Sequence, residues 1–200
     1  MNRILLLLGI ITLLGCSPKP KPKQNFPVPS RADIEEVIET VLAQDSLFYF
    51  KNKKPLSIDL QKMKVYKADS TSLPPPPFLY FSPMLIGNLL NQKYLGEKLF
   101  TRRDSDYLFF QNDTLRKFKI DTSQLSDFKV TTNNVILKKI KMKEFYPFYQ
   151  ITIPIFSLDQ KRAYLEINDR CGMCGGGQGV LLEKVNGHWK IVKVFTTYMT

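Results

Sequence analysis

The chain has 200 residues, 44% of them hydrophobic, with fourteen phenylalanines and a net charge of +11. This composition excludes a disordered chain, and the length suits one domain with a substantial core. The positive charge indicates anionic partners, whose kind depends on the compartment in which the protein works.

The N-terminus has the features of a bacterial export signal. Arg3 provides a positive charge, and the apolar stretch 4–14 is too short for a membrane-spanning helix, which needs roughly 20 residues. The stretch ends in Leu13-Leu14-Gly15-Cys16, which resembles the lipobox of bacterial lipoproteins. The resemblance implies a signal peptide over 1–15 and lipidation of Cys16, with palmitate-type acyl chains. The alternative is an ordinary signal peptide in which this cysteine is incidental.

Residues 16–30 predict a tether that carries the lipid. The stretch 17–30 contains five prolines and three lysines. It therefore cannot form a helix, and such linkers are extended, at about 3.1 Å per residue. The lysines either contact anionic head groups or only keep the tether soluble.

Export also restricts which molecules the positively charged protein can bind. Cleavage before Cys16 removes one basic residue, Arg3, which leaves a charge of +10. Because an exported protein does not normally meet nucleic acid, we expect no nucleic-acid partner. The expected partners are the membrane, through the lipid, and either an anionic envelope component or another envelope protein. A high charge with no specific partner is the alternative.

The globular part, 31–200, begins with an amphipathic helix. Ser30 and Asp33 have the spacing of a capping box, and the apolar residues that follow recur at helical spacing. The pattern predicts a helix over 31–46. Glu35 and Glu36 are expected on its solvated face.

The middle of the chain is less regular. Residues 47–68 predict one or two short strands, and the four prolines of 74–77 predict a loop. A short helix is expected around 84–90. Asp104 is expected to cap another helix, whose body contains Tyr107, Leu108, Phe110 and Gln111.

Four strands are predicted in the last third, at 148–156, 163–168, 179–184 and 189–196. Asn186-Gly187 is a two-residue hairpin signal, because both residues tolerate positive φ. The sequence thus predicts an α+β fold in which the N-terminal amphipathic helix packs on an antiparallel β-meander.

The segment from Cys171 to Gly179 is the most distinctive motif. A redox CxxC normally opens a helix, whereas here three glycines follow Cys174. A metal site would have only the two cysteines, His188 and Asp169 as candidate ligands, and a phosphate loop would need a Gly-Lys-Ser/Thr ending. We therefore expect no metal, and we expect a Cys171–Cys174 disulfide that restrains a glycine-rich loop, as export to an oxidising compartment allows.

Little in the sequence indicates catalysis. The only histidine, His188, follows a hairpin turn and is expected to face solvent. No Ser/His/Asp arrangement is evident, and the aromatic runs 48–50 and 145–149 are interpreted as core. We assign no catalytic residue and no cofactor.

The C-terminal motifs resemble a group of uncharacterised secreted proteins and lipoproteins of Bacteroidota-type bacteria. The resemblance rests on Pro154-Ile155-Phe156-Ser157, Arg162-Ala163-Tyr164-Leu165, the Cys171-Gly172-x-Cys174-Gly175 motif and Asn186-Gly187-x-Trp189. It implies an envelope location and a shared fold, and no activity. Lys19 in place of acidic residues after Cys16 implies an outer-membrane lipoprotein that faces the periplasm. O-glycosylation in such bacteria implies candidate sites at Ser46, Ser70 and Thr114.

The sequence therefore predicts a membrane-anchored envelope lipoprotein whose domain binds or scaffolds another molecule without catalysis. The alternative is a periplasmic hydrolase or thiol-redox enzyme whose site is not visible in the sequence.

Overall fold

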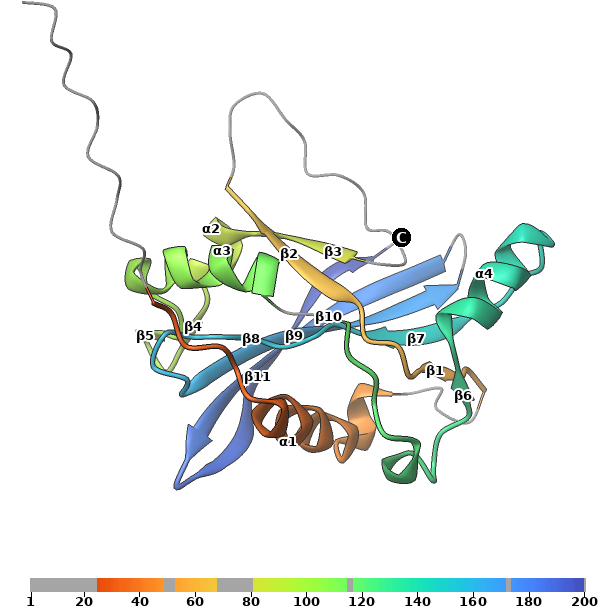
Figure 1. Cartoon of the computed structure of the whole chain (residues 1–200), viewed down its shortest axis with the longest axis horizontal. Coiled ribbons are helices and arrows are strands. Elements are labelled where there is room, and N and C mark those ends of the chain that lie inside the picture. The colour runs from red at the N-terminus through yellow and green to blue at the C-terminus, as the bar shows by residue number, and fades with distance from the viewer. Residues whose placement is uncertain (1–24, 49–52, 68–80, 115–116, 172–173, 200) are drawn as a thin grey trace, which may run out of the picture.

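A seven-stranded sheet runs through the centre of the molecule, with helices on both sides (Figure 1). The structure is a computed structural model that describes residues 25–48, 53–67, 81–114, 117–171 and 174–199. It confirms the α+β class. The sheet has the order β11-β10-β9-β7-β1-β6, and β8 pairs with β9 beside this path. Its strands are β1 (Leu56–Ser57), β6 (Val130–Thr131), β7 (Phe148–Ile151), β8 (Ile155–Phe156), β9 (Arg162–Cys171), β10 (Cys174–Val185) and β11 (His188–Met199).

The last three strands form an antiparallel meander, as predicted. β10 and β11 join through Asn186 and Gly187, whose φ angles of 52° and 86° place both in the left-handed region that the turn requires. The prediction of a glycine-rich loop after Cys174 is wrong, because residues 174–179 already belong to β10. At Gly177 and Gly179, aromatic rings of the neighbouring strands lie close to the strand backbone.

The other half of the sheet is mixed. β1 pairs in parallel with both β6 and β7, so the sheet is not the purely antiparallel meander expected. The single strand predicted at 148–156 is divided into β7 and β8, which both pair with β9. Pro154 lies between them and has no N–H to donate to a continuous ladder.

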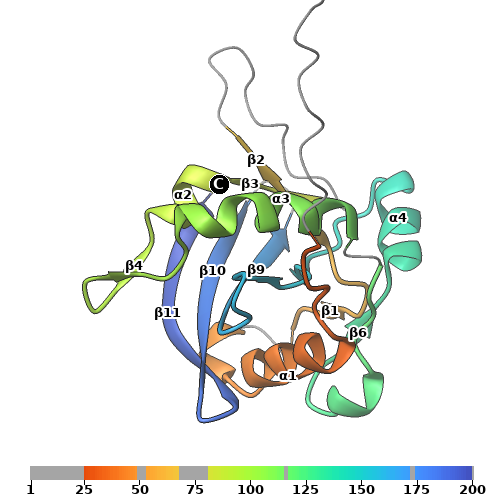
Figure 2. The same cartoon turned by 60° about the vertical axis from the view of Figure 1, so that its left-hand side comes forward.

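Helix α1 (Arg31–Leu42) lies against one face of the sheet (Figures 1 and 2). The Ser30 hydroxyl accepts the Asp33 N–H at 3.0 Å and donates to the Asp33 carboxylate at 2.6 Å. α1 is shorter than the 31–46 helix expected, since the chain tightens into a 3-10 turn, η2 (Asp45–Leu47). The Asp33 carboxylate also accepts a hydrogen bond from Lys184 of β10 at 2.9 Å, which joins the start of α1 to the meander.

The opposite face is covered by a second layer (Figure 2). It contains the parallel pair β2 (Lys62–Tyr66) and β3 (Phe81–Leu85) with the helices α2 (Ile86–Leu90) and α3 (Ser105–Thr114). Two amides of α3 bind backbone groups of neighbouring strands, and the first of them joins the two layers. Gln111 binds the backbone N–H and C=O of Phe156 at 2.9 Å each, and Asn112 binds those of Val65 at 2.8 and 2.9 Å.

The elements predicted in the middle of the chain are confirmed only in part. β1 and β2 are the short strands predicted in 47–68, and the helix expected around 84–90 begins only at Ile86, because Met84 belongs to β3. Asp104 does lie at the start of the α3 region: it directly precedes α3, and its carboxylate accepts the Thr101 N–H at 2.7 Å in a capping box. Pro74–Pro77 lie outside the described residues.

The remaining elements are small, apart from one helix. β4 (Lys93–Tyr94) and β5 (Glu97–Lys98) form a short hairpin, and η3 (Arg102–Asp104) and η4 (Thr122–Gln124) are 3-10 turns. Helix α4 (Asn133–Lys141) was not expected from the sequence and projects at one end of the molecule (Figure 1).

Candidate functional site

A pocket of about 790 Å³ lies where the second layer meets the C-terminal strands. Its walls come from β3 and α2 on one side and from the ends of β9, β10 and β11 on the other. The apolar lining includes Met84, Leu85, Leu89 and Phe195. The volume is in the range of pockets that hold small organic molecules. This pocket is the candidate functional site.

A buried carboxyl group, Glu166, forms part of the pocket lining. Glu166 is 4% exposed and accepts hydrogen bonds from the hydroxyls of Ser82 at 2.5 Å and Tyr164 at 2.9 Å. Burial raises the pKa of Glu166, although both hydrogen bonds act in the opposite direction. Burial and the neighbouring Glu166 charge raise the pKa of Tyr164. The carboxyl group therefore holds its proton to a higher pH than an exposed glutamate.

A second polar group in the pocket is centred on Tyr198. Its hydroxyl donates to Asn168 at 3.1 Å, and Asn168 donates to Gln61 at 3.1 Å. Burial raises the pKa of Tyr198. These hydrogen bonds join the end of β11 to the centre of the sheet, so this wall of the pocket is held rigidly in place.

Two buried polar atoms of the lining lack a partner among the described residues. They are Nη2 of Arg170 and Oγ1 of Thr197. Buried donors are nearly always satisfied in folded proteins, and an exception calls for an explanation such as a water, an ion or a functional role. A guanidinium nitrogen and a hydroxyl at one pocket form a suitable site for an anionic or strongly polar group.

Two glycines of β10 create room for the aromatic side of the pocket. A Cβ on Gly179 would lie 2.7 Å from the Phe195 ring and 2.9 Å from the Tyr164 ring. A Cβ on Gly177 would lie 2.4 Å from the Tyr198 ring. The glycines thus allow side chains of the neighbouring strands to approach the strand backbone closely.

The Cys motif borders the same pocket. Cys171 is buried and lines it, as well as a smaller neighbouring pocket of about 400 Å³. Cys171 and Cys174 are direct partners in the β9–β10 register. Directly opposed residues of antiparallel strands have Cα atoms roughly 4.5–5.5 Å apart, within the range of disulfides. The disulfide stays a prediction, since the side chain of Cys174 lies outside the described part of the structure.

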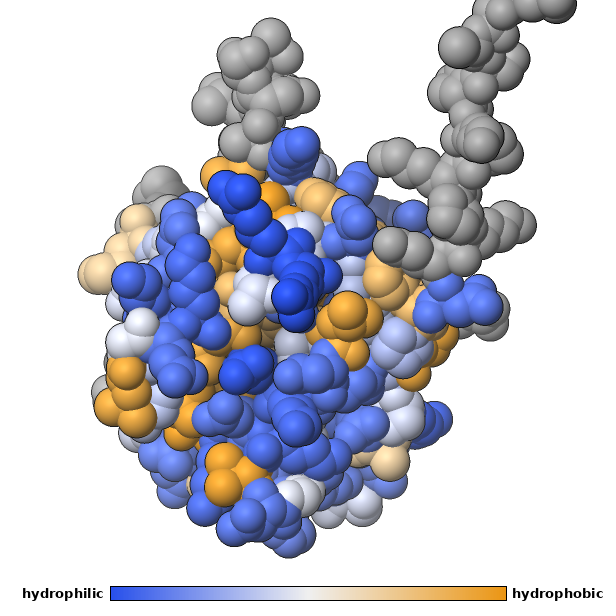
Figure 3. Space-filling model, turned by 90° about the vertical axis from the view of Figure 1, so that its left-hand side faces the viewer, coloured by the Kyte–Doolittle hydropathy of each residue, from blue (hydrophilic) through white to orange (hydrophobic). Residues whose placement is uncertain are grey.

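Of the other residues considered from the sequence, His188 lies away from the pocket and Asp169 lines it. His188 begins β11, is 84% exposed and has Nδ1 3.8 Å from Glu36 of α1, so it faces solvent as predicted. Asp169 forms an ion pair with Lys54 at 2.7 Å. Figure 3 shows the side of the molecule that carries the β10–β11 hairpin, where the surface is mainly hydrophilic with small hydrophobic patches.

The candidate modification sites differ in exposure. Ser46 is exposed in η2, whereas Thr114 is half-buried at the end of α3 and its hydroxyl donates to Phe110 O at 3.1 Å. Ser70 and Cys16 lie outside the described residues. Glycosylation and lipidation therefore remain predictions.

The pocket residues Glu166, Arg170, Thr197 and Tyr198 were not identified from the sequence. One signal was available: Glu166 interrupts an otherwise apolar strand pattern, Ala163-Tyr164-Leu165-Glu166-Ile167. A lone carboxylate in such a strand is unusual and points to a buried polar role.

Within the described ranges, no group of three or more metal-ligating side chains is present, and no helix has the length and apolar character needed to cross a membrane. Comparisons with protein-family models, curated proteins and solved structures give no match to this chain. The geometry of the pocket is therefore the basis for a functional assignment.

Proposed function

We propose that this protein is a binding module that holds a small amphipathic molecule with an anionic end. The observation that carries the proposal is the pair of unpartnered buried atoms, Arg170 Nη2 and Thr197 Oγ1, at a pocket with apolar walls. The anionic end of the ligand would accept hydrogen bonds from these two groups. Its apolar part would lie against Met84, Leu89 and Phe195.

The proposal includes the location predicted from the sequence. The module would be carried by a lipid on Cys16, at the outer membrane and facing the periplasm, with the chain up to Asn25 as the tether. The packing of Phe26 on Tyr107 and Phe110 would fix the end of the tether to the domain. A protein that is held close to a membrane encounters anionic amphiphilic molecules.

Catalysis is the weaker assignment because the carboxyl groups of the described pocket are already held by other side chains, Glu166 by hydroxyl groups and Asp169 by Lys54. The only histidine of the chain lies in the β10–β11 hairpin, and Glu166 is engaged by two hydroxyl donors. The pocket is suited to binding a molecule. General acid–base catalysis would also need a free proton acceptor with a suitable pKa at the reacting atom.

Ligand binding can be tested with decanoate and its uncharged analogue decanol. We expect the full chain to bind decanoate in isothermal titration calorimetry, and Arg170→Gln to weaken this binding about tenfold or more, as loss of a charge-assisted hydrogen bond implies. Decanol binding should change little. Arg103→Gln, at an exposed arginine of η3, is the matched control.

The proposal fails if saturated carboxylates of six to fourteen carbons show no binding that depends on Arg170. Equal weakening of decanoate and decanol by Arg170→Gln would indicate a structural role for the arginine and would also contradict the proposal.

A thiol-redox enzyme is the second candidate, because Cys171 lines the pocket. Against it, Cys174 begins a strand, whereas activated CxxC thiols normally lie at a helix N-terminus. An insulin-reduction assay separates the two. A redox enzyme would accelerate the reaction and lose this activity in Cys174→Ser, whereas a structural disulfide would leave the rate at background.

A further inference from the structure

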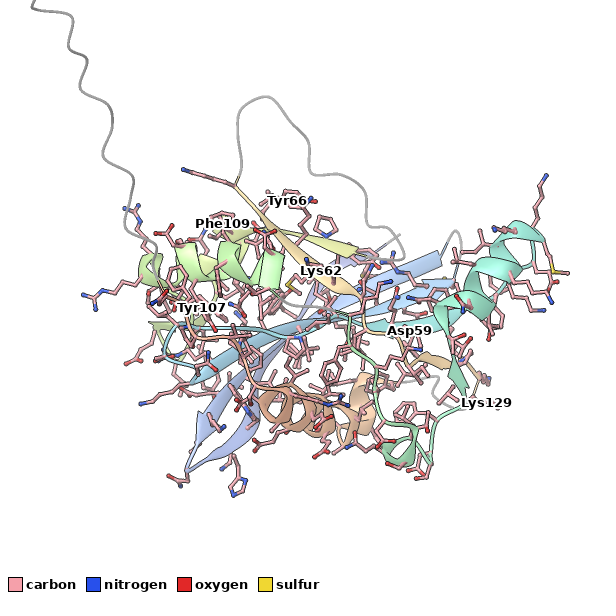
Figure 4. The ribbon with its side chains drawn as sticks, viewed as in Figure 1. Asp59, Lys62, Tyr66, Tyr107, Phe109 and Lys129 are labelled. Atoms are coloured by element: carbon pink, nitrogen blue, oxygen red, sulfur yellow. The ribbon has the colours of Figure 1, made fainter. Side chains whose placement is uncertain are left out.

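Helix α4 is attached to the domain through its first turn. Thr132 Oγ1 accepts the Val135 N–H at 3.3 Å, and the Asp59 carboxylate accepts the Asn133 N–H at 2.7 Å. Ile136 is fully buried. Figure 4 shows Asp59 near the base of the helix and Lys129 near β6. The second half of α4 projects beyond the sheet (Figure 1).

The projecting part exposes large apolar side chains. Within the stretch 138–145, here called the α4 tip, Ile140 is 56%, Met142 57% and Phe145 73% exposed. The sequence interpretation of 145–149 as core is wrong at Phe145, while Phe148 and Tyr149 are buried as predicted. Exposed apolar residues gathered in one short stretch, unlike single ones, indicate an interaction surface.

The same stretch is strongly basic. It contains Lys138, Lys139, Lys141 and Lys143 and one acidic residue, Glu144, which forms an ion pair with Lys139. Lys129 and Val130, also exposed, adjoin the base of α4. Apolar and cationic side chains therefore alternate along the tip.

We propose that the α4 tip docks on an anionic lipid surface. An interfacial helix combines apolar side chains, which enter the boundary between head groups and acyl chains, with lysines that attract anionic lipids. Lysine stems can lie along apolar groups while their ammonium groups reach the phosphates. Ile140 and Lys141 end α4, and Met142, Lys143 and Phe145 follow it, so the tip supplies both kinds of side chain.

The position of the tip fits a second attachment point. The described chain begins near α3, where the Phe26 ring lies 5.5 Å from Tyr107 and 5.3 Å from Phe110. This start and α4 lie at opposite ends of the long axis (Figure 1). If Cys16 is lipidated, which rests on the proposed location, the tether to Asn25 reaches about 28 Å at 3.1 Å per residue. Two distant contacts would fix the orientation of the domain on the membrane.

A fluorescent probe in the tip tests the proposal. The full chain carrying Phe145→Trp is reconstituted in vesicles of phosphatidylcholine and phosphatidylglycerol in which the acyl chains are brominated. We expect a blue-shifted emission that the brominated chains quench. Leu95→Trp, at an 86% exposed leucine of the β4–β5 turn, is the control and should not be quenched. Both variants share the N-terminus and the buried Trp189.

Charge dependence completes the test. The quenching should be lost in pure phosphatidylcholine, in 0.5 M salt, and after Lys138→Gln with Lys141→Gln, because each lysine near an anionic surface changes binding by about fivefold. Equal quenching of the Phe145→Trp and Leu95→Trp variants, or none in either, would overturn the proposal. Decanoate binding does not enter this experiment, so the pocket and the docking surface can fail independently.

Discussion

Glu166 is the residue whose environment makes the clearest prediction about pH. Burial raises its pKa in the folded protein, so the folded state binds this proton more tightly than the unfolded chain. The stability that the proton contributes is complete below the ordinary value of 4.5 and is lost as the pH rises through the raised value.

We therefore expect the free energy of unfolding of the wild type, relative to Glu166→Gln, to fall as the pH rises from 4 through the pKa of Glu166. Urea denaturation of both proteins at several pH values measures this difference. Glu97→Gln, at an exposed glutamate of β5, is the control and should show no comparable trend. A difference that is constant from pH 4 to 7.5 contradicts the assignment.

Single residues also show what the sequence could and could not reveal. His188 was placed in solvent correctly, because its position beside a hairpin turn is a local property. Arg170 and Thr197 were missed, because their importance depends on β3 and α2, which are distant in the sequence. The prediction that Phe145 is buried was wrong. Phe148 and Tyr149 point into the core because they belong to β7, whereas Phe145 precedes this strand and is exposed.

Within β10, alanine is expected to have different effects on stability at Gly179 and at Gly176. A Cβ on Gly179 would meet Tyr164, which is fully buried and has little room to move, so Gly179→Ala should lower the free energy of unfolding by about 1–3 kcal/mol. Gly176 is the control, because its Cβ would only approach Tyr198 O at 3.4 Å.

Gly176→Ala should leave the stability unchanged or slightly raise it, through the smaller entropy of the unfolded chain. Thermal unfolding of both variants gives the comparison. Equal stability of the two variants would mean that the ring contacts at Gly179 relax without cost.

Elements with a strong local signal were predictable. The apolar spacing after Ser30 and the Asn186-Gly187 turn depend on neighbouring residues alone. The glycine-rich part of β10 was not predictable, because its conformation is stabilised by rings from β9 and β11. α4 was also missed, since its stabilising contacts include the carboxylate of Asp59, 74 positions earlier.

For the whole molecule, the lipid on Cys16 is expected to attach the protein to a membrane. Cells expressing the chain should incorporate labelled palmitate into it, and Cys16→Ser should abolish the label and leave the uncleaved precursor mass. Cys171→Ser is the matched control, because that residue is buried in β9. Label that persists in Cys16→Ser would exclude the lipid anchor at this position.

The α+β class followed from the order of local patterns, but the order of the strands in the sheet did not. β1 lies between β6 and β7, which come more than seventy residues later in the chain. Such parallel, long-range pairing leaves no signal in nearby residues, because the chain must close a long connection before the strands meet. The pocket was hidden for a similar reason, because β3 and α2 are distant in the sequence from the strand ends that they face.

The two amides of α3 have a consequence for how the protein behaves at high concentration. Asn112 occupies both the N–H and the C=O of Val65, and Gln111 does the same at Phe156. Unpaired groups at these positions of β2 and β8 would offer a template for strands of other copies. Because side-chain amides fill these positions, we expect that neither strand extends into an intermolecular ladder there, and that α3 thereby limits aggregation.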